Sequence, residues 1–540
     1  MRLLVFIPGI LLVSAISAQD ATTEALNEVT TLKSADGNQT DAPSEIPEIK
    51  KSVRIIGAGL AGLAAAKYLR QCGFSDVKVY DQSEWIGGRV RSIQNPEIGS
   101  DGVLELGAEF NYYYGRNGDD ELDSLIKDLK IGPSLDDTKK IRRKNKEQIL
   151  SIDKCGNVND VTFDRTFDRL LRRVGQNVMG KISVGKNIDK SESIGLLIQD
   201  EMKKEGGNLA KDYVDDVIAM KNNIESLFGA SSWLDISPQT WYYYGKGVDV
   251  ERYPSLGRQG YKPLIDHLIE ESGGAEIFLL NRTVRDITYR GLSNIKFNVE
   301  IDGKTSADSA DYLIITAPIG RMFDDKFSAT MFKEKLPDKK RMAALDIGMG
   351  YKMKIFFMYD RPFWRDNVRV MRFLRFQNST GCDNGQDMEK DLEKNFVVLR
   401  VHPYFDNVLF TNIGGSKKKI ETLENKMKSI NGQAEIKQAI TNVLKRYKIS
   451  DDIPQPERII ASNWLTGQQL ANSLTFMTLK CLQKQTNCVK DIADPIFKEG
   501  SNVPKILFAG DATVEEGLGT AHGAYASGRV AANSLCHLHS

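Results

Sequence analysis

The feature that most constrains the fold is a glycine-rich segment between two short apolar runs. Residues 53–56 have the length and composition of a buried strand. They lead directly into Gly57-Ala58-Gly59-Leu60-Ala61-Gly62, and the helix-like residues 63–70 follow. A second strand candidate, residues 77–80, ends at Asp81. A strand, a glycine-rich turn, a helix and another strand in this order predict a βαβ unit with a parallel sheet.

Each glycine of this turn has a mechanical reason to be there. Gly57 permits the tight turn, Gly59 lets the backbone approach a pyrophosphate group, and Gly62 lets helix and strand pack closely. Phosphates then lie at the helix N-terminus, where free N–H groups and the helix dipole favour anions. Asp81 follows Gly57 by 24 residues, a distance that suits hydrogen bonds to a ribose hydroxyl. The pattern predicts a dinucleotide site and fits FAD and NAD alike.

Four further segments separate FAD from NAD. They are Trp85-Ile86-Gly87-Gly88-Arg89-Val90, Leu104-Glu105-Leu106-Gly107-Ala108-Glu109, Phe508-Ala509-Gly510-Asp511-Ala512-Thr513 and Gly519-Thr520-Ala521-His522-Gly523-Ala524. Through these segments and their order over residues 52–537, the chain resembles the flavin-containing amine oxidase family. The resemblance implies FAD, held non-covalently because the closing segments lack the cysteine to which monoamine oxidases attach it. It places the following residues against FAD: Gly57, Gly59, Leu60, Ala61, Gly62, Asp81, Gln82, Gly88, Arg89, Leu106, Gly107, Ala108, Glu109, Val284, Gly510, Asp511, Thr520, Ala521, His522 and Ala524.

The resemblance also implies the fold. It indicates an α/β protein with a Rossmann-like FAD-binding domain and an α+β substrate-binding domain. A chain of 540 residues is long enough for both. The expected FAD-binding domain comprises residues 52–125, 250–320 and 488–540, and the expected substrate-binding domain comprises residues 126–249 and 321–487. Each domain is therefore discontinuous in the sequence.

Lys354 is the predicted catalytic residue. It begins Lys354-Ile355-Phe356-Phe357, which precedes Pro362-Phe363-Trp364 as in polyamine oxidases of the family. By resemblance it occupies the position of the family lysine that reaches flavin N5 through a water. The alternative is a solvated strand lysine, because Lys352 lies two residues earlier on the same strand face. His522 suits a structural role at a helix start better than that of a base.

The predicted substrate pocket departs from the family pattern. Amine oxidases of the family often hold the substrate nitrogen between two aromatic residues, through cation–π and apolar contacts. Leu474 and Thr520 stand at these two positions, although Phe476 could compensate. Tyr112 stands where polyamine oxidases tend to have a polar or acidic group. The predicted pocket residues are Tyr112, Leu474, Phe476 and Thr520.

Three functions stay open on the sequence. The first is an oxidase that removes hydride from the carbon next to an amine, with a polyamine or related amine as the expected substrate and H₂O₂ as a product. The second is an L-amino-acid oxidase, which needs an arginine for the substrate carboxylate, and the sequence singles out none. The third is a flavin fold kept for binding, with weakened catalysis. Leu474 and Thr520 favour this third function, and Lys354 opposes it.

The N-terminal segment predicts a secreted protein. Arg2 precedes an apolar run over residues 3–13 and then small residues, which is the pattern of a cleaved signal peptide at residues 1–18. Residues 19–50 are rich in Thr, Ser, Asp, Glu and Pro, with almost no aromatic content. They bury too little apolar surface to fold, so a disordered leader is expected there.

Secretion would allow both glycosylation and disulfides. Sequons begin at Asn38, Asn281 and Asn378. We expect Asn281 to stay unmodified, because its segment would pack against the adenine of the cofactor. Among the six cysteines, Cys481 and Cys488 would close a short loop. A secreted glycoprotein is the resulting expectation.

The composition argues against several partners. Lys plus Arg number 73 and Asp plus Glu number 72, so the net charge of +1 offers no global field for nucleic acid or an anionic membrane. The absence of CxxC spacing and the five histidines argue against a structural metal site. Beyond the signal segment, no long apolar run predicts a stable membrane span. The expected partners are a small-molecule amine and O₂, and the sequence carries no signal for the oligomeric state.

Overall fold

The computed structural model describes most of the chain from residue 47 onward. Residues 48–540 form one compact unit, built around two large sheets. The predicted signal peptide, almost all of the predicted leader and Tyr112 lie outside the described residues. The described residues are 47–94, 102–109, 121–132, 148–152, 158–159, 173, 176–177, 180, 192–204, 221, 224–240, 256–291, 293–323, 331–366, 368–373, 391–467, 470–483 and 487–540.

The first large sheet has six strands in the order β19-β20-β11-β1-β2-β7. Neighbouring strands are parallel except β19 and β20. Ile55 of β1 lies between Ile314 and Val79 and all three are fully buried, as is typical of a parallel sheet covered on both faces. β1 begins within the predicted leader, because Ile49 pairs with Phe74. The strands are β1 (Ile49–Ile56), β2 (Phe74–Tyr80), β7 (Phe278–Leu279), β11 (Tyr312–Ile315), β19 (Ile496–Phe497) and β20 (Pro504–Phe508).

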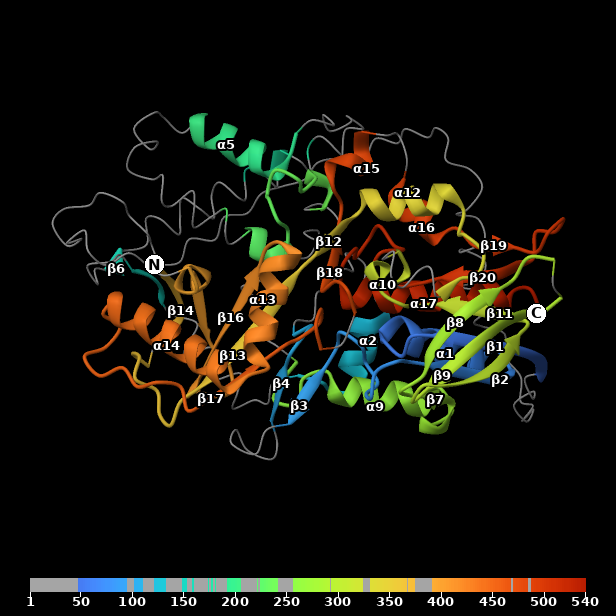
Figure 1. Ribbon diagram of the computed structural model, residues 1–540, viewed down its shortest axis with the longest axis horizontal. Coiled ribbons are helices and arrows are strands. Elements are labelled where there is room, and N and C mark those ends of the chain that lie inside the picture. The colour runs from blue at the N-terminus through green and yellow to red at the C-terminus, as the bar shows by residue number, and fades with distance from the viewer. Residues whose placement is uncertain are drawn as a thin grey trace, which may run out of the picture. The chain divides into compact units, whose positions relative to one another are not determined.

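Two helices from distant parts of the sequence pack together on this sheet. They are α1 (Leu60–Gln71) and α17 (Ala521–Cys536), which share one core with β1 and β2 (Figure 1). The two helices approach closely at Gly528, where a Cβ atom would lie 2.1 Å from the carbonyl oxygen of Ala61. A disulfide between Cys72 and Cys536 joins their C-terminal ends.

The opposite face of the parallel sheet has a different covering. Side chains alternate along its strands, so Ile55 and Ile314 belong to the core with α1, whereas Ile56 and Leu313 belong to a second core. That second core includes an antiparallel sheet in the order β10-β9-β8. Its strands are β8 (Thr283–Thr288), β9 (Ile295–Ile301) and β10 (Lys304–Ala310).

The second large sheet has seven strands in the order β17-β13-β16-β15-β14-β5-β6. Neighbouring strands are antiparallel except β14 and β5. Ile355 and Phe357 of β13 pack with α13 and α14, which lie beside this sheet in Figure 1, whereas Phe356 packs with Leu104 and Leu106 on the other face. The elements are β5 (Gln148–Ile152), β6 (Val158–Asn159), β13 (Lys352–Met358), β14 (Val368–Phe373), β15 (Val398–Val401), β16 (Val408–Gly414), β17 (Arg458–Ala461), α13 (Lys417–Met427) and α14 (Ile430–Arg446).

Short elements complete the described structure. Four of them form two antiparallel pairs, β12 with β18 and β3 with β4. None of the described helices is long and apolar enough to cross a membrane. These elements are β3 (Ser92–Gln94), β4 (Val103–Glu105), α2 (Glu121–Asp128), α5 (Ile194–Lys204), α9 (Lys262–Glu271), η3 (Ala275–Ile277), α10 (Ile319–Phe323), α12 (Asp338–Asp346), β12 (Gly348–Gly350), η4 (Glu393–Asn395), β18 (Leu474–Phe476), α15 (Leu479–Gln483) and α16 (Cys488–Ala493).

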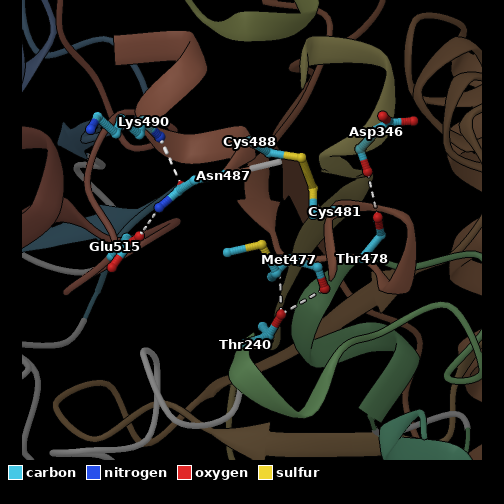
Figure 2. Close-up of a disulfide and its surroundings, with 9 residues drawn as sticks. All are labelled: Thr240, Asp346, Met477, Thr478, Cys481, Asn487, Cys488, Lys490 and Glu515. Atoms are coloured by element: carbon cyan, nitrogen blue, oxygen red, sulfur yellow. Dashed lines mark hydrogen bonds between the residues drawn. A yellow bond between two sulfur atoms is a disulfide. The ribbon is translucent and has the colours of Figure 1, made fainter. Parts of the chain in front are cut away.

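A second disulfide joins α15 to α16. It links Cys481 to Cys488, which the sequence had offered as one pair that could close a short loop, and Figure 2 shows it with its surroundings. Asn487 caps α16, since its Oδ1 accepts from the Lys490 N–H at 3.0 Å. The Asn487 side chain also donates to Glu515 at 2.5 Å, which ties the start of α16 to the loop that precedes α17.

Asn281 is one of the three sequon residues. Its side chain is exposed in the described structure and its backbone has a φ of +54°, and the expectation that the cofactor's adenine keeps it unmodified stays a prediction. Asn281 lies in the turn between β7 and β8, where its N–H donates to the Ser83 carbonyl. Asn38 and Asn378 lie outside the described residues.

Candidate flavin and substrate site

The turn between β1 and α1 leaves no room for side chains at two glycines. Gly57 has a φ of +116°, and a Cβ atom there would lie 2.4 Å from Thr316 Oγ1. A Cβ atom on Gly62 would lie 1.9 Å from the Gly57 carbonyl oxygen. Thr316, directly after β11, donates to that carbonyl at 2.9 Å. The backbone conformation and the close approaches therefore require glycine, as the sequence predicted.

The start of α1 is open to a ligand. Its N-cap, Gly59, makes no side-chain capping bond, and the first turn holds no acidic residue. The N–H groups of Leu60 and Ala61 therefore keep donor capacity at the positive end of the helix. A Cβ atom on Gly88 would lie 3.2 Å from the Gly59 Cα atom, so the second glycine segment lies directly against the turn. This arrangement suits a phosphate group.

Asp81 lies at the end of β2 and contacts the same turn. Its Oδ2 accepts from the Ala58 N–H and its Oδ1 from the Ser83 N–H, each at 2.7 Å. Burial raises the pKa of Asp81, and the backbone hydrogen bonds oppose that effect. The neighbouring Gln82 accepts from Arg321 at 3.0 Å, and the buried Val284 follows on β8. The ribose contact of Asp81 and the adenine contact of Val284 stay predictions.

Arg89 and Asp511 join two predicted flavin segments that are far apart in the sequence. The guanidinium donates to both carboxylate oxygens of Asp511, at 2.6 and 3.2 Å. Thr475 of β18 also donates to Asp511, at 2.8 Å, and Arg89 donates to the Ser473 carbonyl. Bidentate Arg–carboxylate pairs fix orientation as well as position. The pair therefore holds the first and last parts of the candidate site in one geometry.

The closing segment begins α17. Thr520 is the N-cap, accepting from the Gly523 N–H at 3.2 Å and donating to the Gly517 carbonyl at 2.7 Å. Ala521, the buried His522 and Ala524 form the first turn. The preceding Gly510 has a φ of +136°, which fits the sharp bend after β20.

Lys354 is buried, which excludes the solvated alternative. Its ammonium donates to the carbonyl oxygens of Glu105 and Gly107 at 2.8 and 2.9 Å, and to Glu109 Oε2 at 2.6 Å. A lysine has three N–H donors, so these bonds use all of them. The Ala108 N–H donates to the Arg89 carbonyl at 3.3 Å, which connects this stretch to the Arg89–Asp511 pair. Lys354 therefore ties the seven-stranded sheet to predicted flavin residues.

Glu105, beside this lysine, is a further buried group. Its Oε1 accepts from Ser92 Oγ at 2.7 Å and from the Tyr261 N–H at 2.6 Å. Burial raises the pKa of Glu105 to about 7, and the charge of Lys354 opposes that rise. The stretch from Glu105 to Glu109 thus places two carboxyl groups near Lys354. That of Glu109 is bonded to the lysine, and that of Glu105 is buried and bonded to Ser92 and Tyr261.

Three of the four predicted pocket residues lie within the described structure, Leu474 and Phe476 on β18 and Thr520 in a segment that approaches it, since a Cβ atom on Gly519 would lie 2.2 Å from the Thr475 carbonyl oxygen. Thr520 uses its hydroxyl to cap α17. Phe476 is buried and packs with Phe228 at a ring distance of 6.5 Å, and Leu474 pairs with Gly350 of β12. Thr475 lies between them on the opposite side of β18 and reaches Asp511. The pocket assignment stays a prediction, and Thr475 is a site residue that the sequence did not reveal.

Comparison with known proteins decides the family. The model for flavin-containing amine oxidoreductases matches residues 60–536. The chain belongs to this family. It is therefore a flavin-dependent amine oxidoreductase, and the sequence-based prediction of family and fold class is confirmed.

Individual relatives of this amine oxidoreductase cover most of its length. It is 26% identical to protein anon-37Cs of Drosophila melanogaster, with 88% of each chain covered. It is 24% identical to the peroxisomal N(1)-acetyl-spermine/spermidine oxidase of Bos taurus, covering 93% of this chain and 97% of the relative. Among solved structures, cyclohexylamine oxidase from Brevibacterium oxydans IH-35A is 18% identical, with a TM-score of 0.61 over 91% of this chain and 99% of that one. This last likeness shows the shared fold.

The described residues of this family member fit a flavin. The turn at Gly57 and the open start of α1 suit phosphates, while the Arg89–Asp511 pair and Lys354 lie further along the same continuous set of contacts. Within the described residues, no three His, Cys, Asp or Glu side chains gather where they could hold a metal ion. The Lys354–Glu109 bond was missed because the partners are 245 residues apart. The sequence hinted at this bond only in that Lys354 and Glu109 each lie in a segment that resembles the family.

Proposed function

We propose that the protein is an oxidase that holds FAD non-covalently and acts on amines, with Lys354 as the catalytic residue. The C–H bond next to the amine nitrogen breaks, its hydride leaves, and the nitrogen lone pair forms the C=N bond of an imine. Water then hydrolyses the imine to a carbonyl compound and a free amine or ammonia. When bound, the flavin supplies the hydride acceptor and passes the two electrons to O₂, which becomes H₂O₂.

The observation that carries the proposal is the burial of Lys354 against residues 105–109. A buried ammonium loses its hydration, and an apolar side chain would pack there without that cost. Its bond to Glu109 and its two carbonyl contacts hold the ammonium in one orientation. Retention of this cation beside predicted flavin residues favours a chemical role over packing.

The cofactor proposal has a direct test. The purified protein should be yellow, and denaturation should release the flavin into solution as FAD. The non-covalent state is supported by the absence of cysteine from residues 508–524. A folded, colourless preparation that does not take up added FAD would contradict the cofactor. Flavin that stays on the denatured chain would contradict only the non-covalent part.

A polyamine or a related amine is the first substrate class to test. The bovine relative is named for acetylated spermine and spermidine, and the sequence pattern around Lys354 resembles polyamine oxidases. The experiment measures H₂O₂ release from flavin-loaded protein with polyamines, monoamines and amino acids in parallel. Release that requires Lys354 supports the proposal. No release from any amine would instead favour a flavin protein kept for binding.

The secretory location is also part of the proposal. Two disulfides in the described structure fit an oxidising compartment, as does the signal-like segment at residues 1–18. Expression of the full chain in a secreting eukaryotic host should release protein whose N-terminus begins after Ser17 or Ala18. Retention inside the cell with Met1 intact would contradict this location. Glycopeptide mass spectrometry of the same sample reports on the sequons at Asn38, Asn281 and Asn378.

A further inference from the structure

One face of the seven-stranded sheet carries cations beside Lys354. Residues paired across neighbouring strands point to the same side, and residues two apart on one strand share a face. Asn412 of β16 pairs with Lys354 of β13, and Phe410 of β16 pairs with Arg400 of β15. Lys352 precedes Lys354 by two residues on β13. Lys352, Lys354, Asn412 and Arg400 therefore lie on one face, spread over three adjacent strands.

Two of these cations form no ion pair within the described residues. Glu109 is bonded to Lys354, whereas Lys352 and Arg400 are half-buried and make no side-chain hydrogen bond or ion pair there. Burial lowers the pKa of Lys352 to about 8, and the charges of Lys354 and Arg400 act in the same direction, against the charge of Glu109. Burial likewise lowers the pKa of Arg372 on β14 to about 10, assisted by Arg400. The cations are thus close enough to repel one another.

An acceptor lies among these cations. Asn412 is on β16, between the strand of Lys352 and the strand of Arg400. Its Oδ1 is buried and makes no hydrogen bond within the described structure. A buried polar atom of this kind is normally satisfied, so it marks a place where a ligand N–H could bind. The face thus offers positive donors on two strands and a neutral acceptor on the strand between them.

This pattern of charge does not suit a polyamine. A polyamine brings several ammonium groups, which Lys352 and Arg400 would repel, while Glu109 is already paired with Lys354. A carboxylate would instead supply the counter-charge that these half-buried cations lack, since an unpaired cation removed from water is costly. The planar guanidinium of Arg400 also matches a carboxylate in two parallel hydrogen bonds.

Building on the proposed amine oxidation, we propose that the substrate is an amine that carries a carboxylate. Arg400 and Lys352 bind the carboxylate, and Asn412 Oδ1 accepts from the amino group. With an α-amino acid, the Cα–H bond would break, the flavin when bound would supply the acceptor of its hydride, and the product would be an imino acid. Water hydrolyses the imino acid to a 2-oxo acid and ammonia, while O₂ takes up the two electrons and two protons as H₂O₂.

The first test compares substrates that differ by the carboxylate alone. The pairs are lysine and 1,5-diaminopentane, ornithine and 1,4-diaminobutane, and phenylalanine and 2-phenylethylamine. The kcat/KM for H₂O₂ release should be about 100-fold higher for the acid of at least one pair, the effect of losing hydrogen bonds to charged groups. Faster turnover of the decarboxylated members would overturn the inference and leave amine oxidation intact. If no member of any pair is turned over, amine oxidation itself is contradicted. The carboxylate site is then tested by ligand binding alone, as described next.

The second test measures binding without turnover. Benzoate should raise the Tm of flavin-loaded protein, whereas benzamide, which has the same shape and no charge, should not. Arg400→Gln should abolish the benzoate shift and Arg400→Lys should retain part of it, because lysine keeps the charge but not the planar fork. Arg361→Gln is the matched control, since Arg361 is 75% exposed and contacts Asp452 at 3.7 Å.

Two results of this binding test would overturn the inference. One is an equal shift with benzoate and benzamide in the parent protein. The other is an unchanged benzoate shift in Arg400→Gln that still carries its full complement of flavin. If Arg400→Gln does not fold, Arg400→Lys takes its place, and a shift as large as that of the parent then counts against the proposal.

Discussion

The two large sheets carry their functional groups in different ways. The parallel sheet presents backbone and glycines directly after β1, as at Gly57 in the turn and Gly62 in the first turn of α1. The seven-stranded sheet presents side chains from within its strands, such as Lys354, Asn412 and Arg400. Strand register alone brings these side chains together.

This difference predicts different responses to mutation. A site built from backbone depends on conformations that only certain residues permit, so one added methyl group can destroy it. A site built from side chains keeps its frame when one group is removed and loses only what that group did. Substitutions in the two sheets should therefore separate cofactor binding from turnover.

The largest effect is expected at the glycine turn. Gly57→Ala places a Cβ atom 2.4 Å from Thr316 Oγ1 at a φ of +116°, so the turn must rearrange. We expect the protein to purify without flavin and without oxidase activity. The measurement is the ratio of flavin to protein absorbance. Gly132→Ala is the matched control, because an added Cβ there meets nothing within 4 Å.

A yellow, active Gly57→Ala protein would contradict the proposed difference between the two sheets. It would show that the turn next to β1 adapts and that backbone geometry does not limit flavin binding. A Gly132→Ala protein that also lost flavin would point instead to general sensitivity of the fold.

The next effect is expected at Lys354. Lys354→Met should keep FAD bound and lower turnover about 10²-fold, the usual value of one positioned proton-transfer or hydrogen-bonding group. Stopped-flow absorbance would measure flavin reduction and reoxidation separately. Glu109→Gln keeps an acceptor for Lys354 and removes the charge, so it tests whether the ion pair or the ammonium itself matters. Rates equal to those of the parent in both half-reactions would rule out a catalytic role.

The disulfides should differ in what they contribute to stability. Cys72 and Cys536 are 464 residues apart, and Cys481 and Cys488 are 7 apart. Longer closed loops restrict the unfolded chain more, so we expect losses of about 6 kcal/mol for Cys72–Cys536 and about 2.5 kcal/mol for Cys481–Cys488 in the free energy of unfolding. Chemical denaturation of the two double Cys→Ser variants, with FAD present, would measure both. Equal losses would show that local strain or packing outweighs loop length.

The smallest effect concerns pH. Burial lowers the pKa of His402 to about 3, so between pH 6.5 and pH 3 the unfolded chain binds a proton that the folded protein does not. Stability is therefore lost as pH falls through this range, by about 2 kcal/mol between pH 6.5 and pH 5. His402→Gln should remove that slope. Denaturation at pH 7 and pH 5 provides the measurement.

Glu105 should have the opposite influence. Its pKa is raised to about 7, so the folded protein holds a proton between pH 4.5 and pH 7 that the unfolded chain has released. The contribution of Glu105 to the free energy of unfolding therefore rises as pH falls and partly offsets the loss caused by His402. Glu105→Gln removes this offset, so the variant should lose more stability than the parent between pH 7 and pH 5. If both variants keep the parent's pH slope, neither buried group controls it.

The parallel sheet was readable from the sequence because its signals are local. Gly57, Gly59 and Gly62 stand within six residues, and the strand before them is plainly apolar. The closing segment was readable for the same reason, whereas the ion pair between its Asp511 and Arg89 was not predicted. Residues that a local backbone conformation requires can thus be recognised within a few neighbouring positions of the sequence.

The seven-stranded sheet was much less readable. Lys354 was found by resemblance, but Arg400 and Asn412 carry no motif, and their nearness to Lys354 depends on the register of β13, β16 and β15. The sequence therefore singled out no arginine for a carboxylate. Thr475 was missed for a similar reason, because its contact with Asp511 depends on which side of β18 it faces.

The disulfide between α1 and α17 has a consequence for synthesis of the protein. At about 5–20 residues per second, roughly 20–90 s separate the emergence of Cys72 and Cys536 from the ribosome. During that time α1 lacks α17, one of its packing partners, and the Cys72 thiol is exposed to other cysteines as they appear. Completion of the cofactor site must therefore await synthesis of α17. A premature stop before α17 should be as damaging to flavin binding as the loss of β1.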